Sequence, residues 1–133
     1  MLKTKPEHCP CGTKKDYLQC CGQFIEQGRL ALTAETLMRS RYSAYAVADE
    51  AYLLRSWHES TRPTQLGLDS DAVDWVKLEV LAKNQGSPLD THGTVEFIAH
   101  YQLQNKERKI HEVSHFVKQN KQWFYVDGVL KTE

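Results

Sequence analysis

Apolar and polar side chains alternate along the segment VEFIAHYQL, residues 95–103. The odd-numbered positions of this segment are all apolar, whereas Glu96, His100 and Gln102 lie between them. A period of two is typical of a strand with one face buried and the other exposed. The segment therefore predicts a strand that contributes one face to the core.

Shorter segments on both sides of this strand repeat the pattern. Val76, Leu78 and Val80 alternate with Lys77 and Glu79, and residues 110–118 and 123–127 also favour strands. Residues 105–108 and 120–121 are polar and are typical of the turns between them. Residues 75–128 therefore predict an antiparallel meander of about four strands.

Residues 33–60, before the strands, have helical spacing. Thr33 is a candidate N-cap for a first helix, and Asp49 is a candidate N-cap for a second. The expected buried stripe of the first helix comprises Ala34, Leu37, Met38, Tyr42 and Tyr45. Helices followed by a meander of strands indicate an α+β domain with the helices on one face of the sheet.

Composition limits the class of protein. The chain has 133 residues, 41% hydrophobic and 26% charged, which is typical of one folded domain with a small appendage. Seventeen Lys and Arg residues balance seventeen Asp and Glu residues, so net charge does not indicate direct nucleic-acid binding. The sequence has no apolar segment long enough for a signal peptide or a membrane span. We therefore expect a cytoplasmic protein without a membrane partner.

All four cysteines, Cys9, Cys11, Cys20 and Cys21, lie within thirteen positions in the spacing C-x-C-x8-C-C. A disulfide framework would distribute its cysteines through the fold, and the cytoplasm keeps thiols reduced, so the cluster favours metal. Zinc prefers four tetrahedral ligands, and four thiolates are a common set. We predict a structural zinc site that orders residues 1–24, ahead of an iron–sulfur cluster, a redox dithiol or a disulfide. We also expect the core of the strand-rich part to exclude the cysteines.

Four lysines lie on or beside the cysteine cluster: Lys3, Lys5, Lys14 and Lys15. Four thiolates around one divalent ion carry a net charge of about −2, which Lys14 and Lys15 could offset. The same charges could bind a negatively charged partner. Contact with a protein or with the ribosome through the zinc module is therefore one expected function.

The segment CPCGTKKDYLQCCG, residues 9–22, resembles the SEC-C motif. That resemblance implies that the four cysteines are zinc ligands and that the module docks onto protein partners or the ribosome. Many members of the motif have a second glycine at the position that Lys14 occupies in this chain.

Further segments are similar to the YchJ-like family of small bacterial proteins. They are LMRSRYSAY (37–45), YLLRSWH (52–58), GTVEF (93–97), HEVSHF (111–116) and WFYVDG (123–128). The resemblance implies a SEC-C zinc knuckle at residues 1–24 and a nuclear-transport-factor-2-like (cystatin-like) α+β domain at residues 25–133. In that fold a curved antiparallel sheet wraps helices into a cone, whose open mouth is a natural ligand cavity.

Ten polar and aromatic residues are candidates for the lining of this cone. Strand periodicity places Glu112 with Ser114 on one strand, and Trp123 with Tyr125 and Asp127 on the next. A buried carboxylate needs a partner, so we expect an arginine of the set to pair with Glu112 or Asp127. The full candidate set is Arg39, Arg41, Tyr42, Trp57, His58, Glu112, Ser114, Trp123, Tyr125 and Asp127.

Two functional classes are compatible with these patterns. One is an interaction or ligand-binding protein with a structural zinc and a small molecule in the cone. The alternative is a small-molecule enzyme in which Glu112, Asp127 and His58 supply acid–base groups. The sequence contains no complete catalytic motif, which favours the binding protein.

Overall fold

The computed structural model describes residues 6–68 and 73–131. In chain order its elements are a 3-10 helix η1 (Tyr17–Gln19), helices α1 (Gly22–Ile25), α2 (Ala34–Ala46) and α3 (Glu50–Arg55), and strands β1 (Val73–Gln85), β2 (His92–Leu103), β3 (Lys106–Gln119) and β4 (Gln122–Leu130). Helices followed by four strands confirm the predicted α+β class.

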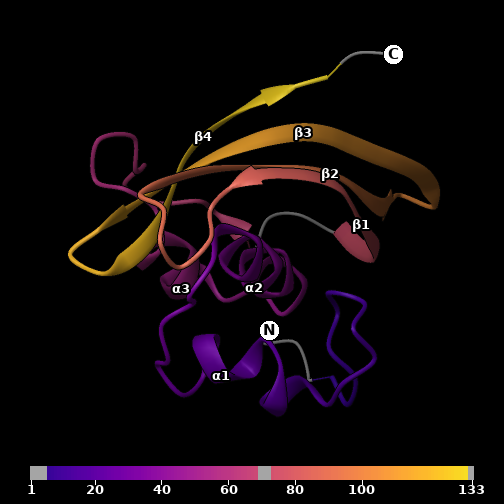
Figure 1. The fold of residues 1–133 in the computed structure, drawn as a ribbon. Coiled ribbons are helices and arrows are strands. Elements are labelled where there is room, and N and C mark those ends of the chain that lie inside the picture. Colours follow the sequence, from indigo (N-terminus) through magenta and orange to yellow (C-terminus); the bar gives the residue numbers. More distant parts are fainter. Residues whose placement is uncertain (1–5, 69–72, 132–133) are drawn as a thin grey trace.

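The four strands form one antiparallel sheet in the order β1-β2-β3-β4, and Figure 1 shows that this sheet is curved. Gln104-Asn105 and Asn120-Lys121 connect the last three strands, and φ at these four residues is between 53° and 68°. Positive φ at both central residues is typical of type I′ hairpin turns. The first turn is tighter than the predicted break at residues 105–108, because β3 already begins at Lys106.

Both predicted helix starts are confirmed. The Thr33 side chain accepts a hydrogen bond from the backbone N–H of Thr36, and Asp49 accepts one from the N–H of Tyr52, each at 3.0 Å. These side chains satisfy N–H groups that the first turn of a helix leaves without partners. None of the helices in the described residues is long and apolar enough to cross a membrane.

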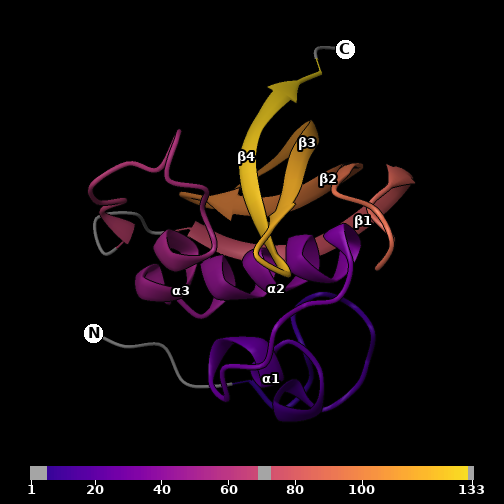
Figure 2. The ribbon, with the colours of Figure 1, turned by 60° about the vertical axis from the view of Figure 1, so that its left-hand side comes forward.

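Helix α2 is the middle layer of three. Figures 1 and 2 show the sheet on one side of α2 and the N-terminal segment with α1 on the other. The predicted stripe is buried except for Tyr45, which is half-buried. Four further residues of the helix are also buried, namely Ser40, Arg41, Ser43 and Ala44. The helix is therefore covered on two faces, whereas an ordinary surface helix buries one.

The cysteines belong to the main core of the protein. Cys9, Cys11 and Cys21 form one continuous buried cluster with Tyr17 and with the apolar residues of α2 and the sheet. The expectation that the core excludes the cysteines is therefore wrong. Residues 1–24 have few apolar side chains of their own, but the N-terminal module packs directly on α2 and shares its core.

Candidate functional site

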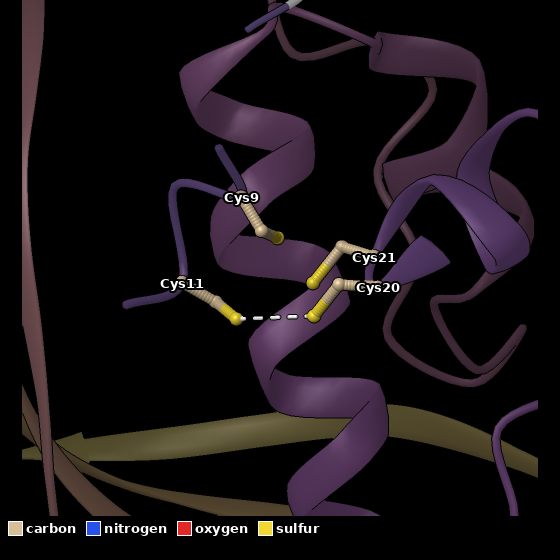
Figure 3. Close-up of side chains that lie close together, drawn as sticks. All are labelled: Cys9, Cys11, Cys20 and Cys21. Atoms are coloured by element: carbon tan, nitrogen blue, oxygen red, sulfur yellow. Dashed lines mark hydrogen bonds between the residues drawn. The ribbon is translucent and has the colours of Figure 1, made fainter. Parts of the chain in front are cut away.

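The four cysteines come from two short segments of the N-terminal module that face each other (Figure 3). Cys9 and Cys11 precede Gly12, whose φ of 94° lets the chain turn sharply. Cys20 and Cys21 lie between η1 and α1. All four sulfur atoms lie within 4.8 Å of one another, so the turn and the helix junction converge on one point.

The sulfur positions fit a tetrahedral metal centre. Thiolates at about 2.3 Å from a zinc ion lie about 3.8 Å from one another, and Sγ of Cys11 is 3.7 Å from Sγ of Cys20. Hydrogen bonding with Cys21 and then Cys9 lowers the pKa of Cys11, and hydrogen bonding with Cys11 and Cys9 raises the pKa of Cys21. The protons that the sulfurs share are those that a divalent ion would displace. The cluster can therefore hold a metal ion.

Helix α2 provides polar contacts to the cluster. Oγ of Ser43 lies 3.5 Å from Sγ of Cys9, and Nη1 of Arg39 donates a 3.0 Å hydrogen bond to the carbonyl oxygen of Cys11. Burial would lower the pKa of Arg39, but its 2.9 Å pairing with Glu35 and the charge of Cys11 raise it. The guanidinium therefore remains charged beside the thiolates and offsets part of their negative charge.

Arg39 therefore lies on the side of α2 that faces the cysteines, outside the cone in which the sequence placed it. Residues 39 and 41 are about 200° apart around a helix of 3.6 residues per turn, so they point to opposite sides of α2. Lys14 and Lys15 are exposed, and it is Arg39 that contacts the cysteine cluster. Lys3 and Lys5 lie outside the described residues.

On its other side, α2 borders a cavity of about 310 Å³ beneath the sheet. Five of the predicted residues line it: Arg41, Tyr42, Glu112, Ser114 and Tyr125. The remaining lining is mostly aromatic or aliphatic. A partly open apolar space with a few polar groups is the usual character of a small-molecule site.

Arg41 is a buried cation at this cavity, with only 6% of its surface exposed. Its Nη1 donates to the carbonyl oxygen of Leu53 at 2.8 Å and to Oγ of Ser56 at 2.7 Å. The guanidinium carbon lies 4.9 Å from the ring centroid of Trp57 and 4.5 Å from that of Tyr125. Burial lowers the pKa of Arg41. Arg41 forms no ion pair with any carboxylate in the described residues, so the predicted arginine–carboxylate pair is wrong.

Glu112 lies at the same cavity and is held by neutral donors. Ser114 Oγ donates to Glu112 Oε2 at 2.6 Å, and the hydroxyl of Tyr125 lies 3.5 Å from the same oxygen. The carboxylate also lies against the backbone of Gly128, where a Cβ atom would overlap with it. Glycine at this position of β4 therefore makes room for the Glu112 side chain.

Asp127 lies on the outer face of the sheet, away from the cavity. Its Oδ1 is 2.9 Å from Nδ1 of His115, and both side chains are exposed. In the β3–β4 pairing, Phe116 is opposite Tyr125 but His115 is opposite Asp127, so Val126 is an extra residue. This β-bulge reverses the alternation, which is why the predicted face of Asp127 is wrong.

Three further candidates also lie outside the cavity lining. Trp57 packs on Arg41 but does not line the space. His58 is at the surface, with Nε2 2.7 Å from Oε1 of Gln119. Trp123 is buried in the core and donates from Nε1 to the carbonyl oxygen of Leu32 at 3.1 Å. The acid–base trio of the enzyme alternative is not assembled, because only its glutamate lines the cavity.

Comparison with known proteins identifies the family of this fold. The family model described as the YchJ middle NTF2-like domain matches residues 33–128, which include α2, α3 and the first three strands in full. The chain belongs to the YchJ family. UPF0225 proteins related to this YchJ-family chain occur in Bordetella pertussis, with 42% identity over 96% of each chain, and in Chromobacterium violaceum, with 46% identity over 92% of each.

Two solved structures resemble the YchJ-family chain beyond the matched domain. A SEC-C motif containing protein from Rhodopseudomonas palustris has a TM-score of 0.81 and 32% identity, covering 94% of this chain and 99% of that one. A SEC-C motif containing protein from Psychrobacter arcticus has a TM-score of 0.74 and 26% identity, covering 97% and 85%. These matches confirm the predicted NTF2-like fold and the resemblance to SEC-C proteins.

The cavity of this YchJ-family chain is also lined by residues that the sequence did not place there. Tyr45 and Trp75 line it, and the Trp75 ring packs 5.8 Å from that of Tyr42 and 5.9 Å from that of Tyr45. Tyr45 continues the helical spacing of Met38 and Tyr42, so that periodicity was the signal for its place in the cavity. For Trp75 the sequence offers no such signal, because no local pattern separates a core tryptophan from one that lines a cavity.

Proposed function

We propose that this chain is a small-molecule-binding protein whose cone cavity is the binding site and whose four cysteines hold a structural zinc ion. The observation that supports ligand binding most directly is the environment of Arg41. A buried cation beside an aromatic cavity, without a carboxylate partner among the described residues, is costly for a folded protein. A ligand that accepts hydrogen bonds from Arg41 would reduce that cost.

Ligand binding is tested by a metabolite screen with a blocked variant. Ala99 lines the cavity and Ala82 is exposed on β1, so Ala99→Leu fills the space and Ala82→Leu adds the same atoms at the surface. A true cavity ligand should raise the melting temperature of the wild type and of Ala82→Leu, and should not raise that of Ala99→Leu. Equal shifts in all three proteins, or no stabilising compound, would contradict the proposal.

Zinc in a structural role is supported by the ligand set. All four candidate ligands are thiols, three of them are buried, and structural zinc sites usually have four protein ligands. Protein purified without added metal should contain about one zinc ion per chain, and Cys11→Ser should lower that content. Iron with visible absorbance in the purified protein would overturn the assignment.

A second candidate function is docking of the zinc module on a negatively charged partner. Lys14 and Lys15 are exposed and make no hydrogen bond or ion pair through their side chains in the described residues, and Arg39 contacts the cluster in their place. Co-sedimentation with ribosomes, one of the partners that the SEC-C resemblance implies, should weaken as salt rises and in the double variant Lys14→Glu/Lys15→Glu. Lys106→Glu/Lys121→Glu changes the net charge equally at other exposed sites and is the matched control. Equal sedimentation of the two variants would remove this candidate.

A further inference from the structure

The cone cavity contains one side chain of each charge. Among the described residues that line it, Arg41 and Glu112 are the two that carry a formal charge at neutral pH. Both contact Tyr125, since the guanidinium of Arg41 stacks on its ring and Glu112 lies at its hydroxyl. The two charges are therefore separated by the phenol and do not neutralise each other directly.

Both charged groups have hydrogen-bonding capacity to spare. Nη1 of Arg41 has two acceptors, but Nε and Nη2 donate to no described residue. Oε2 of Glu112 accepts from Ser114, but Oε1 accepts from none of the described residues. No fully buried side-chain nitrogen or oxygen in the described residues lacks a partner. The spare atoms therefore border open space, and the cavity is the space that both residues line.

The cavity walls between these polar groups are aromatic and fit a planar apolar ligand. The rings of Tyr42 and Trp75 pack edge to face, with centroids 5.8 Å apart, and those of Phe116 and Tyr125 pack similarly at 5.9 Å. All four side chains line the cavity. Aromatic walls favour an aromatic or aliphatic ligand that displaces poorly bound water from between them.

We propose that the cavity binds a small aromatic molecule of no net charge whose polar edge carries a hydrogen-bond acceptor beside a donor. A primary carboxamide or a lactam has this edge. Its carbonyl oxygen faces the spare N–H groups of Arg41, and its N–H faces the spare oxygen of Glu112. This inference rests on the proposed function and specifies the class of ligand.

The two opposite charges of the cavity favour a ligand without net charge. Arg41 would attract a carboxylate ligand, but Glu112 would repel it in a site of low dielectric constant. An ammonium ligand would be attracted by Glu112 and repelled by Arg41. Either ligand would also lose its hydration shell on entry. An uncharged amide avoids both costs and still satisfies the two unpaired groups.

Three probes with the same ring system separate these cases: 2-naphthamide, 2-naphthoate and 2-naphthylmethylamine, which are neutral, anionic and cationic. Each is titrated into the zinc-loaded protein while the methyl resonances of Ala99 and Ile110 and the amide resonance of Ser114 are followed by NMR, since all three residues line the cavity. We expect saturable shifts with 2-naphthamide at a Kd about tenfold or more below that of either charged probe. Equal or tighter binding of a charged probe would overturn the ligand class and leave the proposed function standing. Binding of none of the three would also overturn the class, and the metabolite screen then decides the proposed function.

A charge variant provides the second arm. Glu112→Gln keeps the shape of the side chain but removes the negative charge, so affinity for 2-naphthoate should rise about tenfold. Glu96→Gln is the matched control, because Glu96 pairs with His111 outside the cavity lining. Unchanged 2-naphthoate affinity in Glu112→Gln, or an equal rise in Glu96→Gln, would refute the role of Glu112. Because the variant keeps the hydrogen-bonding shape, its melting temperature serves as the check that it has folded.

Discussion

Lys14 has a backbone conformation that is unfavourable for any residue with a side chain. Its φ is 66°, in the left-handed region, and its side chain is exposed. This is the position at which the SEC-C motif often has a second glycine, and glycine adopts that conformation without steric cost. Lys14 therefore adopts the left-handed conformation at a conformational cost of about 1–2 kcal/mol.

Replacing Lys14 with glycine should stabilise the N-terminal module. The variant relieves the left-handed strain but adds conformational entropy to the unfolded chain, so we expect a net gain of about 1 kcal/mol or less. Competition of the zinc site with a chelator, and the melting temperature, measure the gain. Lys15→Gly removes the same charge at a residue without positive φ, and should be neutral or destabilising. A loss of stability in Lys14→Gly equal to that in Lys15→Gly would show that the turn is not strained.

Helix α2 is anchored at its first turn by one carboxylate. Glu35 accepts hydrogen bonds from Lys83 of β1 and from Arg39, each at 2.9 Å, and so connects the helix to the sheet and to the arginine that contacts the cysteine cluster. Burial alone would raise the pKa of Glu35, but the two hydrogen-bonded cations outweigh burial and lower it. A carboxyl group whose pKa is lowered on folding contributes stability as its anion.

That contribution has a defined pH dependence. It is present above the ordinary pKa of 4.5 and is lost as the pH falls through the lower pKa of the folded state. Glu35→Gln should therefore cost about 1 kcal/mol at pH 7, and the difference from the wild type should shrink as the pH falls below 4.5. Urea unfolding across this range measures it. Glu79→Gln removes a carboxylate that is also paired but more exposed, with 39% of its side chain accessible against 24% for Glu35, and should have a smaller effect; an equal effect of both variants would contradict the anchoring role of Glu35.

The sequence predicts the elements better than it predicts which face of each element points to the cavity. Alternation correctly places Tyr125 of β4 at the cavity, but the bulge at Val126 turns Asp127 outward, and no local pattern announces a bulge. Helical spacing likewise separates Arg39 from Arg41, but it does not say which face meets the sheet. The choice depends on where the N-terminal module docks, which is a long-range property.

Across the whole molecule, the NTF2-like fold followed from the family resemblance, and the predictions from residue spacing and type hold mainly for local features. Element order, the caps at Thr33 and Asp49 and the convergence of the cysteines follow from spacing and residue type. The sharing of one core by the cysteine module and α2 does not, because the contacts join segments far apart in sequence. The division into two domains at residue 24 stays a prediction.

The shared core predicts that metal removal destabilises the entire chain. Chelation should free the turn at Cys9 and Cys11, withdraw the contacts of Ser43 and Arg39, and expose the buried face of α2. We expect a single unfolding transition for the zinc form and a melting temperature lower by at least about 5 °C after chelation. Calorimetry of the zinc form, the chelated form and Cys11→Ser tests this. An unchanged melting temperature of the sheet after chelation would show that the two parts are energetically independent.

The position of α2 between two layers also has a consequence for synthesis on the ribosome. The segments that cover the side of α2 facing the cysteines precede it in the chain, so that side can be closed as soon as residue 46 has emerged. The sheet side needs β4, which ends at Leu130, and at about 5–20 residues per second the wait is roughly 4–17 s. Zinc bound early would therefore let one apolar surface of the nascent helix be covered before the sheet that covers the other surface has been synthesised.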